Sequence, residues 1–99
     1  MAKKGIKFDS GKLRWSLLPY DALADVVRVL MHGAAKYEDF NWQHVVSEDG
    51  GKARYFDALQ RHLIAWWNGE INDPEDGLSH LAHATCCLLF LLWKERNGE

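Results

Sequence analysis

The chain has few of the features that mark a secreted, membrane-bound or nucleic-acid-binding protein. It contains two cysteines and two prolines in 99 residues, and its formal net charge is only −2. Because non-specific nucleic-acid binders carry a strongly basic face, we expect no nucleic-acid polymer as a partner. The N-terminus lacks an apolar signal core, and the apolar stretch 81–93 is shorter than the ~20 residues of a membrane helix. We therefore expect a cytoplasmic protein that does not contact a membrane.

The two cysteines, Cys86 and Cys87, are adjacent in an apolar run. Neighbours on a helix point about 100° apart and cannot readily form a disulfide with each other. We expect both to be buried, reduced side chains that contribute packing, which agrees with a cytoplasmic location.

Apolar residues, in contrast, are abundant. They make up 47% of the chain, and five of them are tryptophan. A domain of this length buries only about two-thirds of the surface that its unfolded chain exposes. The excess of apolar side chains therefore predicts a homo-oligomer, a dimer or a larger assembly.

The hydrophobic pattern predicts a mainly α protein formed by a single helical domain, 1–99. Leu23, Val26, Val27 and Leu30 recur at helical spacing. We expect an extended N-terminal arm at 1–19, helices at 20–37, 53–68 and 73–96, and a loop at 38–52. Asp73 and the proline after it favour a helix start at that point. The expected architecture is a three-helix antiparallel bundle with an N-terminal arm, completed by oligomerisation.

Three histidines and several acidic residues form the first candidate site. His62 lies on the second predicted helix, His80 and His83 lie on the third, and acidic residues occupy the turn between them. Neutral imidazoles and carboxylates are ligands for divalent metals, and a carboxylate-rich set suits Mg²⁺ or Mn²⁺. The alternative is that the histidines are hydrogen-bonded in a helical core and the acidic turn only caps a helix.

A second candidate site combines cations with aromatic rings. Lys36 could contact a phosphate, Asn41 could bond to a base edge, and Tyr37 or Trp42 could stack on a base. The alternative is a helix end followed by a loop that an aromatic side chain anchors. Basic residues also cluster in the arm, where they are either a solvated terminus or a contact for anionic phosphate.

Asp57 and Arg61 are spaced i, i+4 on a polar helix face. This spacing is typical of an ordinary surface salt bridge. Arg61 would have a functional role only if its helix face lines a cleft.

Five segments in this order resemble the phage-encoded dATP/dGTP diphosphohydrolase N-terminal domain family. They are 7–14, 33–37, 41–42, 61–63 and 69–84. The resemblance extends over about 6–92 and implies a mainly α protein of phage or prophage origin, located in the host cytoplasm. It also implies hydrolysis of purine deoxynucleoside triphosphates to monophosphate and pyrophosphate, with Mg²⁺ or Mn²⁺ as cofactor.

Under this resemblance we assign candidate roles to the polar residues. The expected catalytic residues are His62, His80 and Glu70. The expected metal ligands are Glu70, Asp73, Glu75, His80 and His83. The expected nucleotide contacts are Lys12, Arg14, Lys36, Tyr37, Asn41, Trp42 and Arg61.

The sequence departs from related all-α nucleotide pyrophosphatases in its carboxylates. Those relatives hold metal with Glu-x-x-Glu on one helix and Glu-x-x-Asp on the next, whereas this chain has Glu-x-x-Asp only in the turn from Glu70 to Asp73. Asp76 stands where the family pattern leads us to expect serine. Two alternatives to an enzyme therefore stay open: a protein that binds and sequesters a nucleotide to counter a host signalling defence, and a structural subunit of a larger enzyme.

Overall fold

The computed structural model describes residues 4–98, and within them the protein is mainly α, as the sequence predicts. Its elements are η1 (Trp15–Leu17), α1 (Tyr20–Lys36), α2 (Asn41–Ser47), α3 (Gly51–Trp67) and α4 (His80–Asn97). Residues 1–3 and 99 of the predicted domain lie outside the described part. No helix within 4–98 combines the length and the apolar character needed to cross a membrane.

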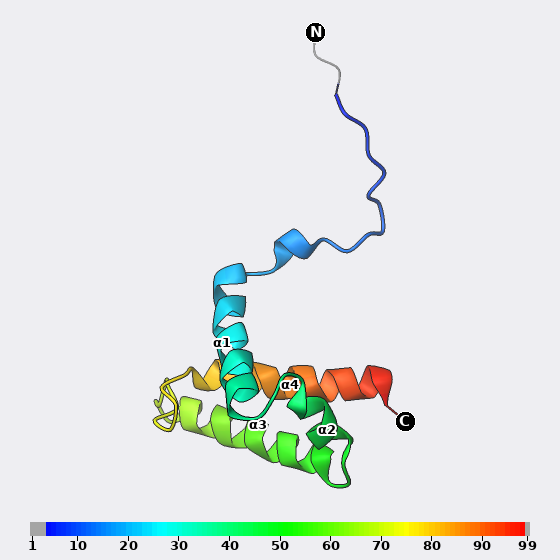
Figure 1. The fold of residues 1–99 in the computed structure, drawn as a ribbon. Helices are drawn as coiled ribbons and strands as arrows, with labels where there is room; N and C mark the ends of the chain where they lie inside the picture. Colours follow the sequence, from blue (N-terminus) through cyan, green and yellow to red (C-terminus); the bar gives the residue numbers. More distant parts are fainter. Residues whose placement is uncertain (1–3, 99) are drawn as a thin grey trace.

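Helices α3 and α4 form an antiparallel pair, and α1 crosses this pair instead of lying along it (Figure 1). The short helix α2 packs against both α3 and α4. The arrangement therefore differs from the predicted three-helix antiparallel bundle, because a fourth helix is present and α1 takes a crossing orientation.

The core lies on the two flanks of α4. On one flank, Ala82 and Cys86 pack with Val26 and Val29 of α1. On the other, Ala84 and Cys87 pack with Leu59 of α3. Small residues on α4 let both neighbouring helices approach closely, so α4 is the element that connects the other helices.

The rest of α4 is less buried than its composition predicts. Leu88 is 54% exposed and Leu92 is 52% exposed, while Met31 of α1 is 65% exposed. A helix that is apolar on every side is expected to be buried on every side. In the single chain it is not, and the expectation that a second copy covers these side chains stays a prediction.

The predicted loop 38–52 contains a helix, α2, which the sequence analysis missed. Trp42 stacks on Phe90 with ring centroids 4.5 Å apart and meets Trp93 edge-on at 5.1 Å. Val46 of the same helix is 1% exposed. These contacts come from α4, so tertiary packing stabilises a segment too short to be a helix on its own.

Gly51 explains why α3 begins two residues before the predicted start at 53. A Cβ at this position would lie 2.0 Å from the Val45 carbonyl oxygen, so only glycine lets the start of α3 meet the end of α2. The C-terminus of α3 agrees better with the sequence, because Gly69 has a φ of +98°. The Gly69 N–H bonds to Trp66 O and the Glu70 N–H bonds to Ala65 O, which is a Schellman motif.

The third predicted helix begins at His80 rather than at 73, so this boundary was wrong. Gly77 has a φ of +74°, which interrupts a helix. The Asp73 side chain does accept a hydrogen bond from a backbone N–H, as a capping residue would. The donor is the Glu75 N–H, 2.9 Å from Asp73 Oδ1, and it belongs to a turn rather than to a helix. The true cap of α4 is Ser79, whose Oγ accepts from the Ala82 N–H at 3.1 Å.

The arm is irregular over its described part. Lys12 N–H bonds to Asp9 O at 3.0 Å, and Gly11 has a φ of +81°. The chain thus turns around Asp9, Ser10 and Gly11, and no strand pairing follows within residues 4–19. The arm leads away from the helices (Figure 1).

The Ser79 cap gives a first prediction. Ser79→Ala removes the acceptor for a backbone N–H in the first turn of α4, so we expect the free energy of unfolding to fall by about 1 kcal/mol. Urea denaturation followed by circular dichroism measures this change. Ser47→Ala is the matched control, because Ser47 is exposed. Equal stability of the two variants would contradict the assignment of the cap.

The cysteines give a second prediction. Both are free, and burial raises the pKa of Cys86 to about 12 and of Cys87 to about 11. Since the thiolate is the reactive form, we expect iodoacetamide at pH 8 to label the folded protein at least ~100-fold more slowly than the urea-unfolded protein. Mass spectrometry at timed intervals measures the two rates. Similar rates would show that the thiols are accessible.

Candidate functional site

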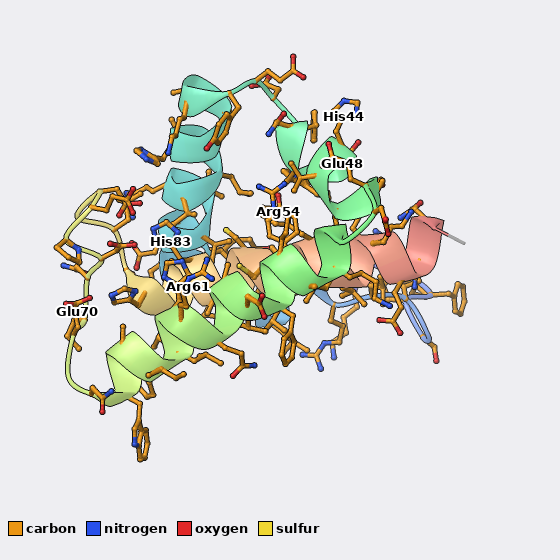
Figure 2. The ribbon with its side chains drawn as sticks, turned by 90° about the horizontal axis from the view of Figure 1, so that it is seen from below. His44, Glu48, Arg54, Arg61, Glu70 and His83 are labelled. Atoms are coloured by element: carbon orange, nitrogen blue, oxygen red, sulfur yellow. The ribbon has the colours of Figure 1, made fainter. Side chains whose placement is uncertain are left out.

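A cleft of about 1190 Å³ opens between α1, α2, α3, α4 and the turn that precedes α4. Figure 2 shows Arg61 of α3 and His83 of α4 directed into the space between these helices, with Arg54 further along α3. The cleft is larger than many small-molecule sites, and it combines charged and aromatic side chains at its surface.

The cleft brings together most of the residues that the sequence analysis singles out, from both candidate sites. Those that line it are Lys36, Tyr37, Asn41, Trp42, Arg61, His62, Asp73, Glu75 and His83. The two candidate sites, which the sequence presents separately, therefore belong to one cleft.

Four of the predicted residues do not line the cleft. Lys12 and Arg14 lie on the arm, away from the helices. Glu70 lies on the turn after α3, apart from Arg61 and His83 (Figure 2). His80 is 4% exposed and is not a lining residue, although it contacts His62, which is one.

The turn 73–78 has a fixed backbone that orients two carboxylates. The Asp73 N–H bonds to Leu78 O at 2.8 Å and the Gly77 N–H bonds to Asp73 O at 2.7 Å. Asp76 Oδ1 accepts from the Leu78 N–H at 2.9 Å, much as Asp73 Oδ1 accepts from Glu75. Backbone donors thus hold one oxygen of each aspartate and leave the second oxygen free for other contacts.

Asp73, Asp76 and His83 bring three potential ligand atoms within 4.8 Å of one another. Asp76 Oδ2 lies 2.8 Å from His83 Nε2. Their orientation does not complete a hydrogen bond, and Nε2 of His83 is a buried polar atom without a hydrogen-bond partner. A buried nitrogen of this kind is costly unless something else satisfies it. Two carboxylates and an imidazole are a donor set that suits a divalent cation such as Mn²⁺.

A second group with ligand potential is made of His62, Asp73 and His80. In this group both ring nitrogens of His80 are already engaged. Its Nδ1 lies 2.9 Å from Nδ1 of His62, and its Nε2 lies 2.6 Å from Oε1 of Glu70. The engaged nitrogens make His80 a partner of other side chains rather than a free ligand.

Burial and neighbouring charges shift the pKa values of His62 and Asp76, two of the titratable groups that line the cleft. Burial, followed by the nearby His83 and His80 rings, lowers the pKa of His62 below its usual 6.5 and favours the neutral ring. Burial alone would raise the pKa of Asp76. The hydrogen bond from the Leu78 N–H and the nearby His83 together outweigh burial, so the pKa of Asp76 is lowered. Asp76 is therefore ionised at neutral pH.

Several cleft residues were not among the predicted site residues, and Asp76, His32 and Arg54 are three of them. In the sequence, Asp76 is one of the acidic residues of the turn beside the three histidines and departs from the family pattern. It is not among the predicted ligands, because its role in the turn cannot be read from spacing. His32 lies with its Nε2 3.9 Å from Asp76 Oδ2, and Arg54 lies 3.8 Å from Glu48. The expected Asp57–Arg61 salt bridge is not among the ion pairs of the described residues, and both side chains line the cleft instead.

Comparison with known proteins places these observations in a family. A dATP/dGTP diphosphohydrolase of Salmonella phage PMBT28 is 40% identical over 93 residues, which cover 94% of this chain and 30% of the relative. The chain thus spans less than a third of the length of that protein. No solved structure matches the chain significantly. The family model for the N-terminal part of dATP/dGTP diphosphohydrolases matches residues 2–99, so the chain belongs to this family.

Proposed function

We propose that this chain binds a purine deoxynucleoside triphosphate in the cleft and takes part in its hydrolysis to monophosphate and pyrophosphate. The observation that carries the proposal is the convergence of the Asp73 and Asp76 carboxylates, the His83 imidazole and the Arg61 guanidinium in one cleft that also contains aromatic rings. The name of the phage relative, dATP/dGTP diphosphohydrolase, supplies the substrate class and the reaction.

The layout of the cleft suits a nucleotide. His83 and Phe90 are separated by two turns of α4, roughly 10 Å along the helix axis. Trp42 stacks on Phe90 at the distant end, whereas the carboxylates lie near His83. Tyr37, which is 64% exposed, offers a ring face for a base. A base near the aromatic residues would therefore leave its triphosphate near the polar end.

Asp73, Asp76 and His83 are the residues that would hold a divalent cation, and the donor set fits Mn²⁺ or Mg²⁺. A cation bound there neutralises phosphate charge and favours attack by water. Glu75 lines the cleft but is not within either group of potential ligands, and Glu70 is outside the cleft. The proposal therefore keeps Asp73 and His83 of the expected ligand set, leaves out Glu70, Glu75 and His80, and adds Asp76.

The remaining contributions come from cations of the protein. Lys36 and Arg61 line the cleft and would neutralise phosphate oxygens as negative charge moves to the leaving group. The oxygen of water bonds to the α-phosphorus, and the bond from the α-phosphorus to the α–β bridging oxygen breaks. Pyrophosphate leaves with the electron pair, and the attacking water gives up a proton to the solvent. Most of the rate enhancement in such chemistry comes from positioning and electrostatic stabilisation.

Hydrolysis assays with dATP and dGTP in the presence of Mn²⁺ test this proposal. We expect pyrophosphate and monophosphate as products, and we expect Asp76→Asn to lower kcat/KM by roughly 100-fold because it removes charge that holds the cation. Glu95→Gln, an exposed change near the end of α4, is the control. Ion-exchange chromatography separates the products.

Sequestration without cleavage is the second candidate function, and one observation favours it. The cleft holds Lys36, Arg54 and Arg61 beside aromatic side chains. Cations and stacking surfaces would be enough to bind a nucleotide without a metal. Calorimetry with and without Mn²⁺ measures the binding. If a nucleotide binds tightly under both conditions and is recovered intact, sequestration rather than hydrolysis is the function. Absence of both binding and cleavage would contradict both functions.

A further inference from the structure

Glu70, His80 and His62 form a hydrogen-bonded chain from the protein surface to the cleft. Oε1 of Glu70 lies 2.6 Å from His80 Nε2, and His80 Nδ1 lies 2.9 Å from His62 Nδ1. The Glu70 side chain is 51% exposed, the His80 side chain is only 6% exposed, and His62 lines the cleft. A buried ring thus connects an accessible carboxylate to a cleft residue.

The hydrogen-bonding chemistry of the three groups determines where the hydrogens lie when Glu70 is ionised and both rings are neutral. An ionised carboxylate only accepts hydrogen bonds, so Nε2 of His80 carries the hydrogen. A neutral imidazole has one N–H, so Nδ1 of His80 is bare and accepts. His62 must then donate from Nδ1, which leaves its Nε2 without a hydrogen.

Two contacts hold these groups in place. The His62 ring stacks on the His83 ring with centroids 4.5 Å apart and an interplanar angle of 3°, which fixes the plane of His62. The Schellman motif at the end of α3 holds the backbone of Glu70, because its N–H bonds to Ala65 O at 3.0 Å. Among the described residues, His62 has no hydrogen-bond partner other than His80.

We propose that Glu70 and His80 are positioning residues that hold His62 in the tautomer with its hydrogen on Nδ1, so that the bare Nε2 accepts a hydrogen bond from a water molecule in the cleft. The role of that water as the attacking group rests on the proposed function. The tautomer itself does not, because it follows from contacts within the protein. Although Glu70 lies outside the cleft, it thus influences the cleft residue His62 through His80.

Nitrogen-15 NMR of the metal-free protein at pH 8, where an ordinary histidine is neutral, tests the tautomers. We expect His62 to carry its hydrogen on Nδ1 and His80 on Nε2. In Glu70→Leu, which removes the acceptor at an exposed position, we expect His62 to populate both tautomers. Glu95→Leu, the matched loss of an exposed carboxylate on α4, should leave the pattern unchanged. A hydrogen on Nε2 of wild-type His62, or an unchanged tautomer in Glu70→Leu, would overturn the proposal.

Steady-state kinetics with dATP and Mn²⁺ test the consequence for the water. We expect Glu70→Leu to lower kcat by about 10-fold, with KM changed less than twofold because Glu70 does not line the cleft. The two proposals fail separately. The expected tautomers in a protein that cleaves no nucleotide would overturn the hydrolytic function alone. An unchanged tautomer in Glu70→Leu would overturn the positioning role even if dATP is cleaved.

Discussion

Close packing along α4 is the constraint on which the other elements depend. Ala82, Ala84, Cys86 and Cys87 are all at most 6% exposed, and they are small enough for α1 and α3 to approach on opposite flanks. The Cys86 thiol even donates a hydrogen bond to the backbone carbonyl of Val26, 3.6 Å away. Larger side chains at these positions would separate the helices and open the cleft, because cores tolerate added volume poorly.

The same helix determines where the polar chemistry can lie. His80 and His83 fall in its first turn, next to the turn 73–78, whose backbone N–H groups each hold one oxygen of Asp73 and Asp76. This geometry separates two tasks. His83 and the aspartates face the cleft, whereas His80 is buried and connects Glu70 to His62.

Much of the fold could be predicted from the sequence, since helical periodicity and Gly69 locate α1 and α3 to within a few residues. The helix α2 could not, because the rings that stabilise Trp42 belong to α4. The start of α4 was misplaced because Asp73 and Ser79 are both good capping residues, and Gly77 decides between them. The convergence of Lys36 and Trp42 with the histidines depends on how α1 crosses α4, which no spacing in the sequence reveals. Likewise, the sequence could not distinguish Glu70 from a metal ligand, because only the structure shows its contact with the buried His80 ring.

The central claim is that the turn 73–78 and His83 form a metal site at the polar end of the cleft. Anomalous X-ray diffraction from crystals soaked in Mn²⁺ tests it most directly, because the signal locates the ion independently of activity. We expect an anomalous peak within bonding distance of Asp73, Asp76 and His83, and loss of that peak in Asp76→Asn. A peak only at other residues, or one that persists unchanged in Asp76→Asn, would contradict it.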